Sequence, residues 1–217
     1  MTNQRNDVQA LRVNWATPRV AKLGHLLNPP RLLVEAGTIL AFVAAILATN
    51  YTLVGFPNVK LFDLMVFVAG YTLGFRRGAI VAASAWLLYG SFNPHGPASL
   101  PLLAILMASE TVYAAAGASI RNIMGPSRVQ ALPSRISLLF GGTAIICTFI
   151  YDGLTNIYTG IIWAQMSQST DYFRWTLTAL FSPGALFFAA GHTASNFLFF
   201  TVLAPILIKG VRKVRGN

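Results

Sequence analysis

The sequence predicts an all-α membrane protein with six transmembrane helices and with both termini in the cytoplasm. Three observations lead to this fold class. Hydrophobic residues make up 55% of the 217 residues and charged residues only 10%, whereas a water-soluble domain carries about 25% charged residues. Long apolar stretches alternate with short polar segments. Six crossings would place fourteen of the 16 lysines and arginines on one side, as in cytoplasmic loops.

The chain is expected to have three parts: a basic cytoplasmic segment at 1–31, a transmembrane domain at 32–209 and a basic cytoplasmic tail at 210–217. Apolar residues at helical spacing in the first part fit either a short amphipathic helix on the membrane surface or a disordered tail. The net charge of +10 is distributed between apolar spans. This distribution favours the anionic leaflet of a lipid membrane over nucleic acid as the partner, so we place the protein in the cell membrane.

The six spans are expected at 32–54, 61–75, 79–89, 100–120, 135–161 and 181–209. The second and third are shorter than the usual minimum of about 17 residues. Between them lies GFRRG at 74–78. Two adjacent arginines in the membrane interior would each cost at least about 2.5 kcal/mol. A turn at the inner surface therefore fits better than one continuous helix or a re-entrant hairpin.

Two of the spans begin with helix-start signals. Ser99 precedes Pro101, and Ser182 precedes Pro183. A hydroxyl group caps the free N–H groups of a first turn, and proline fits there because its missing N–H is not needed. These signals predict Ser99 as the cap of the span at 100–120 and Pro183 as the first helical residue of the last span.

Ionisable side chains inside the spans indicate a site. Glu110, Asp152 and His192 lie within apolar stretches, and a rise of about 1.5 Å per residue puts them at or outward of the membrane midplane. Ionisable groups in a membrane are functional by default, although Glu110 and His192 could instead pair to hold helices together. His192 and Asn196 are four residues apart and should share a helix face. Asp63, at the outer end of the second span, is expected to be solvated.

Several common motifs are absent from the sequence. It has no GxxxxGK[ST] phosphate loop, no HExxH, no cysteine and histidine spacing typical of a metal site, and no GxSxG nucleophile turn. Such motifs would indicate nucleotide, metal or acyl-transfer chemistry. We therefore predict no catalytic residues, no metal and no cofactor. Cys147 is the one cysteine, so no disulfide framework is expected.

Three stretches resemble the substrate-binding membrane subunit, or S component, of energy-coupling factor (ECF) vitamin transporters. They are LFDLMVFVAGYTLGFRRGAIVAASAWLLYG at 61–90, FIYDGLTNIYTG at 149–160 and HTASNFLFFTVLAPILIKGVRK at 192–213. The resemblance covers roughly 33–213 and lies in order, spacing and topology. It implies a six-helix bundle with an outward vitamin pocket. It also implies a transmembrane scaffold subunit and two cytoplasmic ATPases as partners, with the subunit toppling in the membrane to release its substrate inside.

The resemblance assigns roles to particular residues. Glu110, Asp152 and His192 would contact the substrate by charge or hydrogen bonds. The other candidate pocket residues, which would orient polar groups, cover the pocket or offer aromatic faces, are Asn93, His95, Asn156, Tyr158, Trp163 and Asn196. Small residues of the first span would dock on the scaffold subunit, although alanine is common in membrane helices; they are Ala41, Ala44, Ala45 and Ala48.

Two other functions remain open. A small intramembrane enzyme could use Glu110, Asp152 and His192 as acid, base or metal ligands, and a helical scaffold protein would need no ligand. The outward position of the polar residues and the absence of a catalytic motif count against an enzyme. We therefore predict a non-catalytic transporter subunit. Two acids and a histidine suit a substrate with cationic or amide-like groups.

Overall fold

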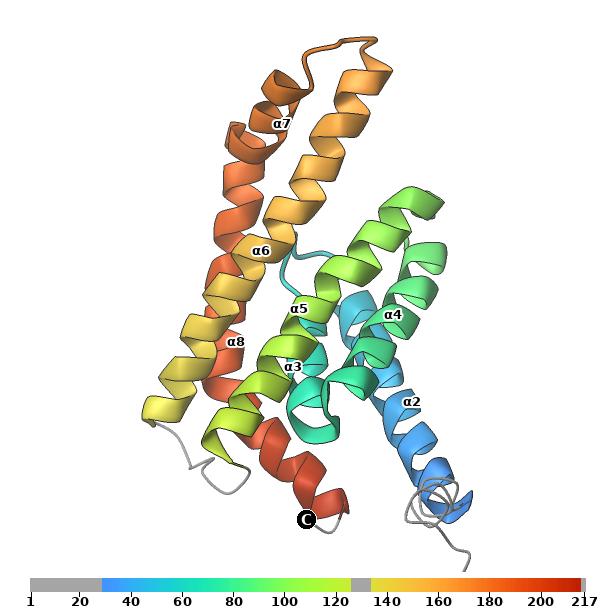
Figure 1. Cartoon of the computed structure of the whole chain (residues 1–217), viewed down its shortest axis with the longest axis vertical. Helices are drawn as coiled ribbons and strands as arrows, with labels where there is room; N and C mark the ends of the chain where they lie inside the picture. The colour runs from blue at the N-terminus through green and yellow to red at the C-terminus, as the bar shows by residue number, and fades with distance from the viewer. Residues whose placement is uncertain (1–28, 126–133, 216–217) are drawn as a thin grey trace, which may run out of the picture. The chain divides into compact units, whose positions relative to one another are not determined.

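The computed structural model describes residues 29–125 and 134–215 (Figure 1). The predicted surface helix or tail at 1–28, the middle of the basic loop at 126–133 and the last two residues, 216–217, lie outside the described residues. The chain divides into two compact units, Met1–Thr38 and Ile39–Asn217. In the first unit, the described residues 29–38 form the first turns of a helix that continues into the second. All packing described below lies within the second unit.

Every regular element of the described residues is a helix, which confirms the all-α prediction. The helices are α2 (Pro29–Thr52), α3 (Phe62–Leu73), α4 (Phe75–Phe92), α5 (Leu100–Met124), α6 (Arg135–Met166), α7 (Tyr172–Phe181) and α8 (Pro183–Arg215). Within 29–125 and 134–215, four helices are long and apolar enough to cross a membrane, at Leu32–Thr52, Leu100–Met124, Arg135–Met166 and Pro183–Arg215. They indicate a membrane-embedded protein. The count of six spans and the orientation of the termini stay predictions.

The predicted helix starts are confirmed. The Ser99 hydroxyl accepts a hydrogen bond from the Leu102 amide at 3.4 Å, and α5 begins at Leu100. The Ser182 hydroxyl accepts one from the Ala185 amide at 3.3 Å, and α8 begins at Pro183. In both places a serine cap and an early proline define the helix end, as the sequence indicates.

The turn between α3 and α4 is tighter than predicted. Gly74 alone separates the two helices, and its φ of 90° lies in a region that glycine adopts readily and other residues avoid. Arg76 and Arg77 belong to the first turn of α4 rather than to a turn between the spans. Arg77 Nη1 donates a hydrogen bond to the Leu73 carbonyl at 3.2 Å, so this arginine satisfies a carbonyl at the end of α3.

The end of α6 and the segment after it also differ from the prediction. α6 continues to Met166, beyond the expected end at 161. A separate helix, α7, follows in the stretch between the expected spans at 135–161 and 181–209. The Asp171 carboxylate caps α7 by accepting a hydrogen bond from the Arg174 amide at 3.0 Å. With 10 residues, α7 is too short to cross a membrane and gives no span signal.

α3 is the central helix of the second unit. Ten of its 12 residues are buried, and it contacts α4, α5 and α8. Its approach to α5 depends on glycine: a Cβ atom on Gly70 would overlap the carbonyl of Ala114, and one on Gly117 would overlap the carbonyl of Phe67. Small residues at such positions allow two helix backbones to touch in a membrane.

Aromatic side chains form a layer across the interior. The centre of the Phe67 ring on α3 lies 5.3 Å from the ring centre of Phe140 on α6 and 5.0 Å from that of Phe200 on α8. Tyr71 lies 5.9 Å from Phe140. Aromatic pairs of this kind each contribute about 0.5–1.5 kcal/mol beyond their burial. The layer therefore stabilises the packing of α3 against α6 and α8.

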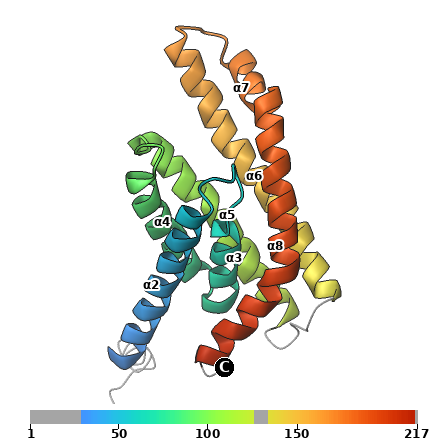
Figure 2. The same ribbon diagram turned by 180° about the vertical axis from the view of Figure 1, so that it is seen from behind.

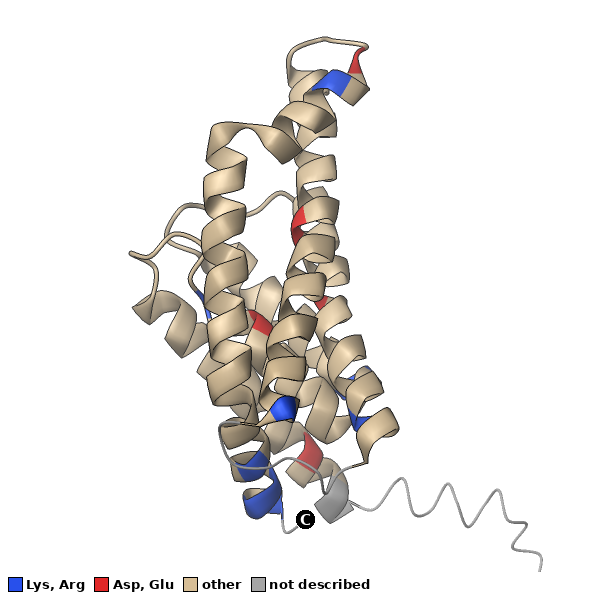
Figure 3. Cartoon of the chain, turned by 90° about the vertical axis from the view of Figure 1, so that its left-hand side faces the viewer, with Lys and Arg blue, Asp and Glu red and all other residues tan. Residues whose placement is uncertain are grey.

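Basic residues gather at the end of the second unit where α8 terminates. Figures 2 and 3 show the C-terminal turns of α8 near the end of α3, with Lys and Arg beside the C-terminus. Arg215 Nη1 donates a hydrogen bond to the Thr72 carbonyl at 3.2 Å, and the Arg212 guanidinium lies 5.5 Å from the centre of the Tyr71 ring. The Gly74 turn and the end of α8 thus share one basic end.

Candidate functional site

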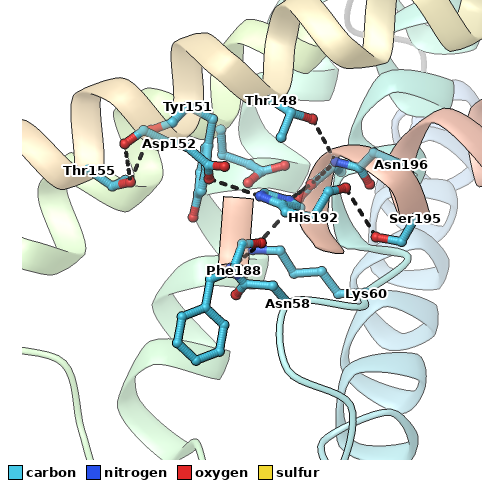
Figure 4. Close-up of polar contacts among 12 residues, drawn as sticks. Asn58, Lys60, Thr148, Tyr151, Asp152, Thr155, Phe188, His192, Ser195 and Asn196 are labelled. Carbon is cyan, nitrogen blue, oxygen red and sulfur yellow. Dashed lines mark hydrogen bonds and ion pairs between the residues drawn. The ribbon is translucent and has the colours of Figure 1, made fainter. Parts of the chain in front are cut away.

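A network of buried polar side chains joins α3, α6 and α8 (Figure 4). His192 stands at its centre. Its Nε2 lies 2.6 Å from Asp63 Oδ2, and its Nδ1 lies 2.9 Å from Asp152 Oδ1. Two such hydrogen bonds need two protons, whereas a neutral imidazole supplies one. Asp63, Asp152 and His192 together therefore hold two such protons. Two ionised carboxylates and a neutral histidine would hold only one.

Asn196 extends the network by one turn of α8. Its amide nitrogen donates to Asp63 Oδ2 at 2.7 Å and to the Thr148 hydroxyl at 2.9 Å, and it lies 3.3 Å from the Tyr113 hydroxyl. The prediction that His192 and Asn196 share a helix face is confirmed, because both contact the same carboxylate. Asn196 is fully buried, so it helps to hold Asp63 in place from the protein interior.

Asp63 corrects an expectation. Its position at the end of a span suggested a solvated carboxylate, but the side chain has no exposed surface. Its Oδ2 accepts from His192 and Asn196, and its Oδ1 lies 4.0 Å from Lys60 Nζ. Within the described ranges, Oδ1 has no hydrogen-bond donor. A buried carboxylate oxygen without a donor is costly, and the nearby ammonium offsets part of that cost.

Glu110 is also fully buried and does not pair with His192, so the pairing considered from sequence is wrong. Its Oε2 accepts a hydrogen bond from the indole nitrogen of Trp86 at 3.1 Å. Its other oxygen has no hydrogen-bond partner among the residues that the structure describes. Glu110 therefore fixes the orientation of Trp86.

A cavity of about 380 Å³ borders the network. Ligand sites in proteins are typically about 300–1,000 Å³. Its lining comes from the loop before α3 and from α4, α5, α6 and α8, and consists of Asn58, Lys60, Trp86, Leu106, Tyr151, Asp152, Thr155, Asn156, Ala185, Phe188, Ala189 and His192. A second cavity, of about 280 Å³, shares Asn58, Lys60, Trp86 and Phe188 with it. The two cavities adjoin at these four residues.

The structure brings several predicted residues to these cavities. Asp152, Asn156 and His192 line the first cavity, and His95 lines the second. Asn93 has a structural task in its loop instead, because its amide nitrogen donates to the Gly96 carbonyl at 2.7 Å and its Oδ1 accepts from the His95 amide at 2.8 Å. This turn holds His95 at the edge of the second cavity.

Other predicted residues lie elsewhere. Tyr158 and Trp163 belong to α6 and are not among the lining residues of either cavity. Glu110 and Asn196 are not lining residues either, and they act through Trp86 and Asp63, which they hold.

Sequence reasoning does not select nine of the 12 residues that line the first cavity, and three of these nine carry a charge or a polar aromatic ring. Lys60 looks like one more charge in an outer loop, and Trp86 and Tyr151 look like ordinary parts of apolar spans. In the structure the Lys60 ammonium lies 5.3 Å from the centre of the Trp86 ring and 5.0 Å from that of Tyr151. The position of Tyr151 directly before Asp152 is the one available signal.

The predicted docking residues of α2 face away from the interior. Ala41, Ala44 and Ala48 are exposed and Ala45 is half-buried. Val43 and Ile46, on the opposite face, are buried. The small side chains therefore form a stripe that faces outward, as a docking surface for another helix requires.

The part of the chain that the structure describes contains no candidate metal centre. In 29–125 and 134–215, no group of three or more histidine, cysteine, aspartate and glutamate residues could hold a metal ion. Cys147 is buried and forms no disulfide. The polar network is therefore an arrangement of hydrogen bonds and ion pairs.

The fold and the site define a helical, membrane-embedded protein with a polar cavity among its helices. Comparison of the chain with protein-family models, with curated proteins and with solved structures found no match. The cavity itself and the sequence features described above are therefore the grounds for a function.

Proposed function

We propose that this protein is the substrate-binding S component of an ECF-type importer in the cell membrane. It captures a vitamin-like small molecule on the outer side, and a transmembrane scaffold subunit with two ATPases delivers the molecule inward. The observation that carries the proposal is the cavity of about 380 Å³ lined by Lys60, Trp86, Asp152, Asn156 and His192. A small number of polar groups that point into a cavity lined by aromatic side chains is typical of small-molecule sites.

The polar network prepares the cavity for binding. His192 is only 1% exposed, while the Asp152 side chain is 16% exposed, so Asp152 is the member of this pair that reaches the open space. The hydrogen bond from His192 fixes its carboxylate before a ligand arrives. Groups held in place in advance lose less conformational entropy on binding, which favours high affinity.

The same contacts count against the enzyme alternative. Both ring nitrogens of His192 are engaged by carboxylate oxygens. Neither nitrogen is then free to bind a metal ion or to accept a proton from a substrate. Glu110 is separated from the cavity and bonded to Trp86. Two of the three residues considered as catalytic acid, base or ligand, His192 and Glu110, are thus occupied in holding the site together.

The other parts of the proposal follow from the resemblance and the topology. The outward-facing alanine stripe of α2 would dock on the scaffold subunit. Positive residues at the α8 end favour a cytoplasmic position for that end, and the cavity then opens to the outside. Toppling of the subunit would bring the cavity to the inner surface.

The first test is mass spectrometry of small molecules released from protein purified in mild detergent. A vitamin-like metabolite at near-equal stoichiometry is expected. Co-purification of a scaffold subunit and two ATPases with the tagged protein is the second expected result. A protein that releases no metabolite and co-purifies with neither partner would contradict the proposal, and tolerance of mutation at the buried acids would then favour a ligand-free scaffold.

Asp152→Asn is expected to weaken binding of the released metabolite by about 10- to 100-fold. The reason is the loss of a charge-assisted hydrogen bond, which contributes about 1.5–3 kcal/mol. Isothermal titration calorimetry with the identified metabolite measures the change. Asp171→Asn is the matched control, because Asp171 is an exposed cap of α7 and is not among the residues that line either cavity. Equal affinities for the two variants would remove Asp152 from the site.

A further inference from the structure

The ammonium group of Lys60 occupies a position that a ligand cation could take. It lies between the faces of Trp86 and Tyr151, 5.3 Å and 5.0 Å from the ring centres, and 4.0 Å from Asp63 Oδ1. A cation within about 6 Å of an aromatic ring is attracted to its face, and proteins recognise alkylammonium ligands with cages of such rings. Two rings and one carboxylate at these distances make an ammonium-binding cage.

Lys60 is held in this cage only loosely. Its distance from Asp63 is at the outer limit of an ion pair, and no described residue accepts a hydrogen bond from its Nζ. Asp63 Oδ1 is buried and, within the described residues, has no hydrogen-bond donor. An ammonium usually donates up to three hydrogen bonds. Because Lys60 makes no such bond, a ligand cation that displaces it has to replace only its cation–π and ion-pair contacts.

We propose that the space between Trp86, Tyr151 and Asp63 is an organic-cation subsite. Lys60 fills it in the ligand-free protein and leaves it when the cationic group of a ligand enters. This inference rests on the proposed function, since it names the chemical class of the ligand for the same cavity: a small molecule with an alkylammonium or similar cationic group.

The geometry of the loop agrees with such a movement. Lys60 lines both cavities, so its departure from the cage opens the space between them. Two residues before it, the side-chain amide of Asn58 donates a hydrogen bond to the Phe188 carbonyl of α8 at 3.4 Å, which links this loop to α8. A side chain can therefore swing while the loop remains attached to α8.

The charges favour a cation over an anion. The carboxyl groups nearest to the Lys60 ammonium and the first cavity are those of Asp63 and Asp152, and Glu110 lies behind Trp86. Lys60 is the one lysine or arginine among the residues that line either cavity. A cationic ligand that replaces the Lys60 ammonium leaves the charge next to Asp63 unchanged. An anionic ligand bound by Lys60 would instead bring a further negative charge to a buried group of acids, which repel it.

The experiment compares full-length wild-type protein with Lys60→Gln, using tetramethylammonium chloride as the probe in isothermal titration calorimetry. Lys60→Gln removes the internal competitor and is expected to bind the probe about tenfold more tightly, since a desolvated cation–π contact is worth about that factor. Lys209→Gln is the matched control: it removes the same charge from an exposed position on α8 and should bind as the wild type does.

A second variant tests whether the cage itself is responsible. Lys60→Gln combined with Tyr151→Leu is expected to lose the gain in affinity, because one aromatic face is gone. A thermal melt of each variant checks that it is folded. If folded Lys60→Gln binds tetramethylammonium no more tightly than the wild type, or if the double variant keeps the gain, the subsite is not where we place it.

The metabolite released from the wild type separates this inference from the proposed function. A cationic metabolite supports both. A stoichiometric anionic metabolite that is lost from Lys60→Gln overturns the organic-cation subsite and leaves the importer subunit standing. Tighter probe binding by Lys60→Gln, in a protein that releases no metabolite and has no partner subunits, supports the subsite and contradicts the importer.

Discussion

Asp63→Ala is expected to lower the free energy of unfolding by about 3–5 kcal/mol, the cost of breaking a buried ion pair by removing one partner. Asp63 Oδ2 is the common acceptor for His192 and Asn196. Its removal leaves the buried Nε2 of His192 without an acceptor and leaves the Lys60 ammonium without its counter-charge. The change is measured by chemical unfolding of the purified protein in mixed micelles.

The control for this variant is Asp171→Ala, in which an exposed carboxylate is lost, and it should cost about 1 kcal/mol as the loss of a helix cap. Asp63→Asn should recover part of the stability, because the amide oxygen can still accept one hydrogen bond in the same place. Equal unfolding curves for Asp63→Ala and Asp171→Ala would show that the network does not hold the helices together.

Gly70→Val is expected to prevent the second unit from folding. A Cβ atom at Gly70 would overlap the backbone of Ala114 on α5, and backbone cannot move aside as the end of a side chain can. Overpacking typically costs about 1–3 kcal/mol and more where the backbone must shift. The expected result is loss of the monodisperse peak in fluorescence-detected size-exclusion chromatography of the tagged protein.

Gly142→Val is the matched control for this prediction. Gly142 lies within α6, and no neighbouring atom lies within 4 Å of the place that a Cβ atom would take there, so the same substitution in another membrane helix should leave the peak intact. Gly117→Val should behave as Gly70→Val does, because it meets the carbonyl of Phe67 in the same crossing. Normal peaks for both interface variants would mean that α3 and α5 are not in backbone contact.

The features that could be predicted from the sequence are those set by near neighbours in the chain. The serine caps before α5 and α8 depend on three or four consecutive residues, and the shared face of His192 and Asn196 depends on helical spacing alone. Both predictions are confirmed. The apolar length of α5, α6 and α8 likewise follows from composition.

The features that could not be predicted depend on distant segments. Asp63 looks solvated at the end of a helix, but His192 and Asn196 of α8 contact its carboxylate in the interior. The cage around Lys60 combines residues of α3, α4 and α6, and no spacing rule for a helix or a turn relates segments so far apart in the chain. α7 could not be predicted because 10 residues give no membrane-span signal.

The length of α3 determines how much of the bilayer thickness this central helix can cross. Its 12 residues extend about 18 Å at a rise of about 1.5 Å per residue, whereas the hydrocarbon core of a bilayer is about 30 Å thick. If its Gly74 end lies at one surface, Asp63 at the other end lies well below the opposite one. The part of the bilayer beyond Asp63 is then crossed by the longer helices, among them α5, α6 and α8.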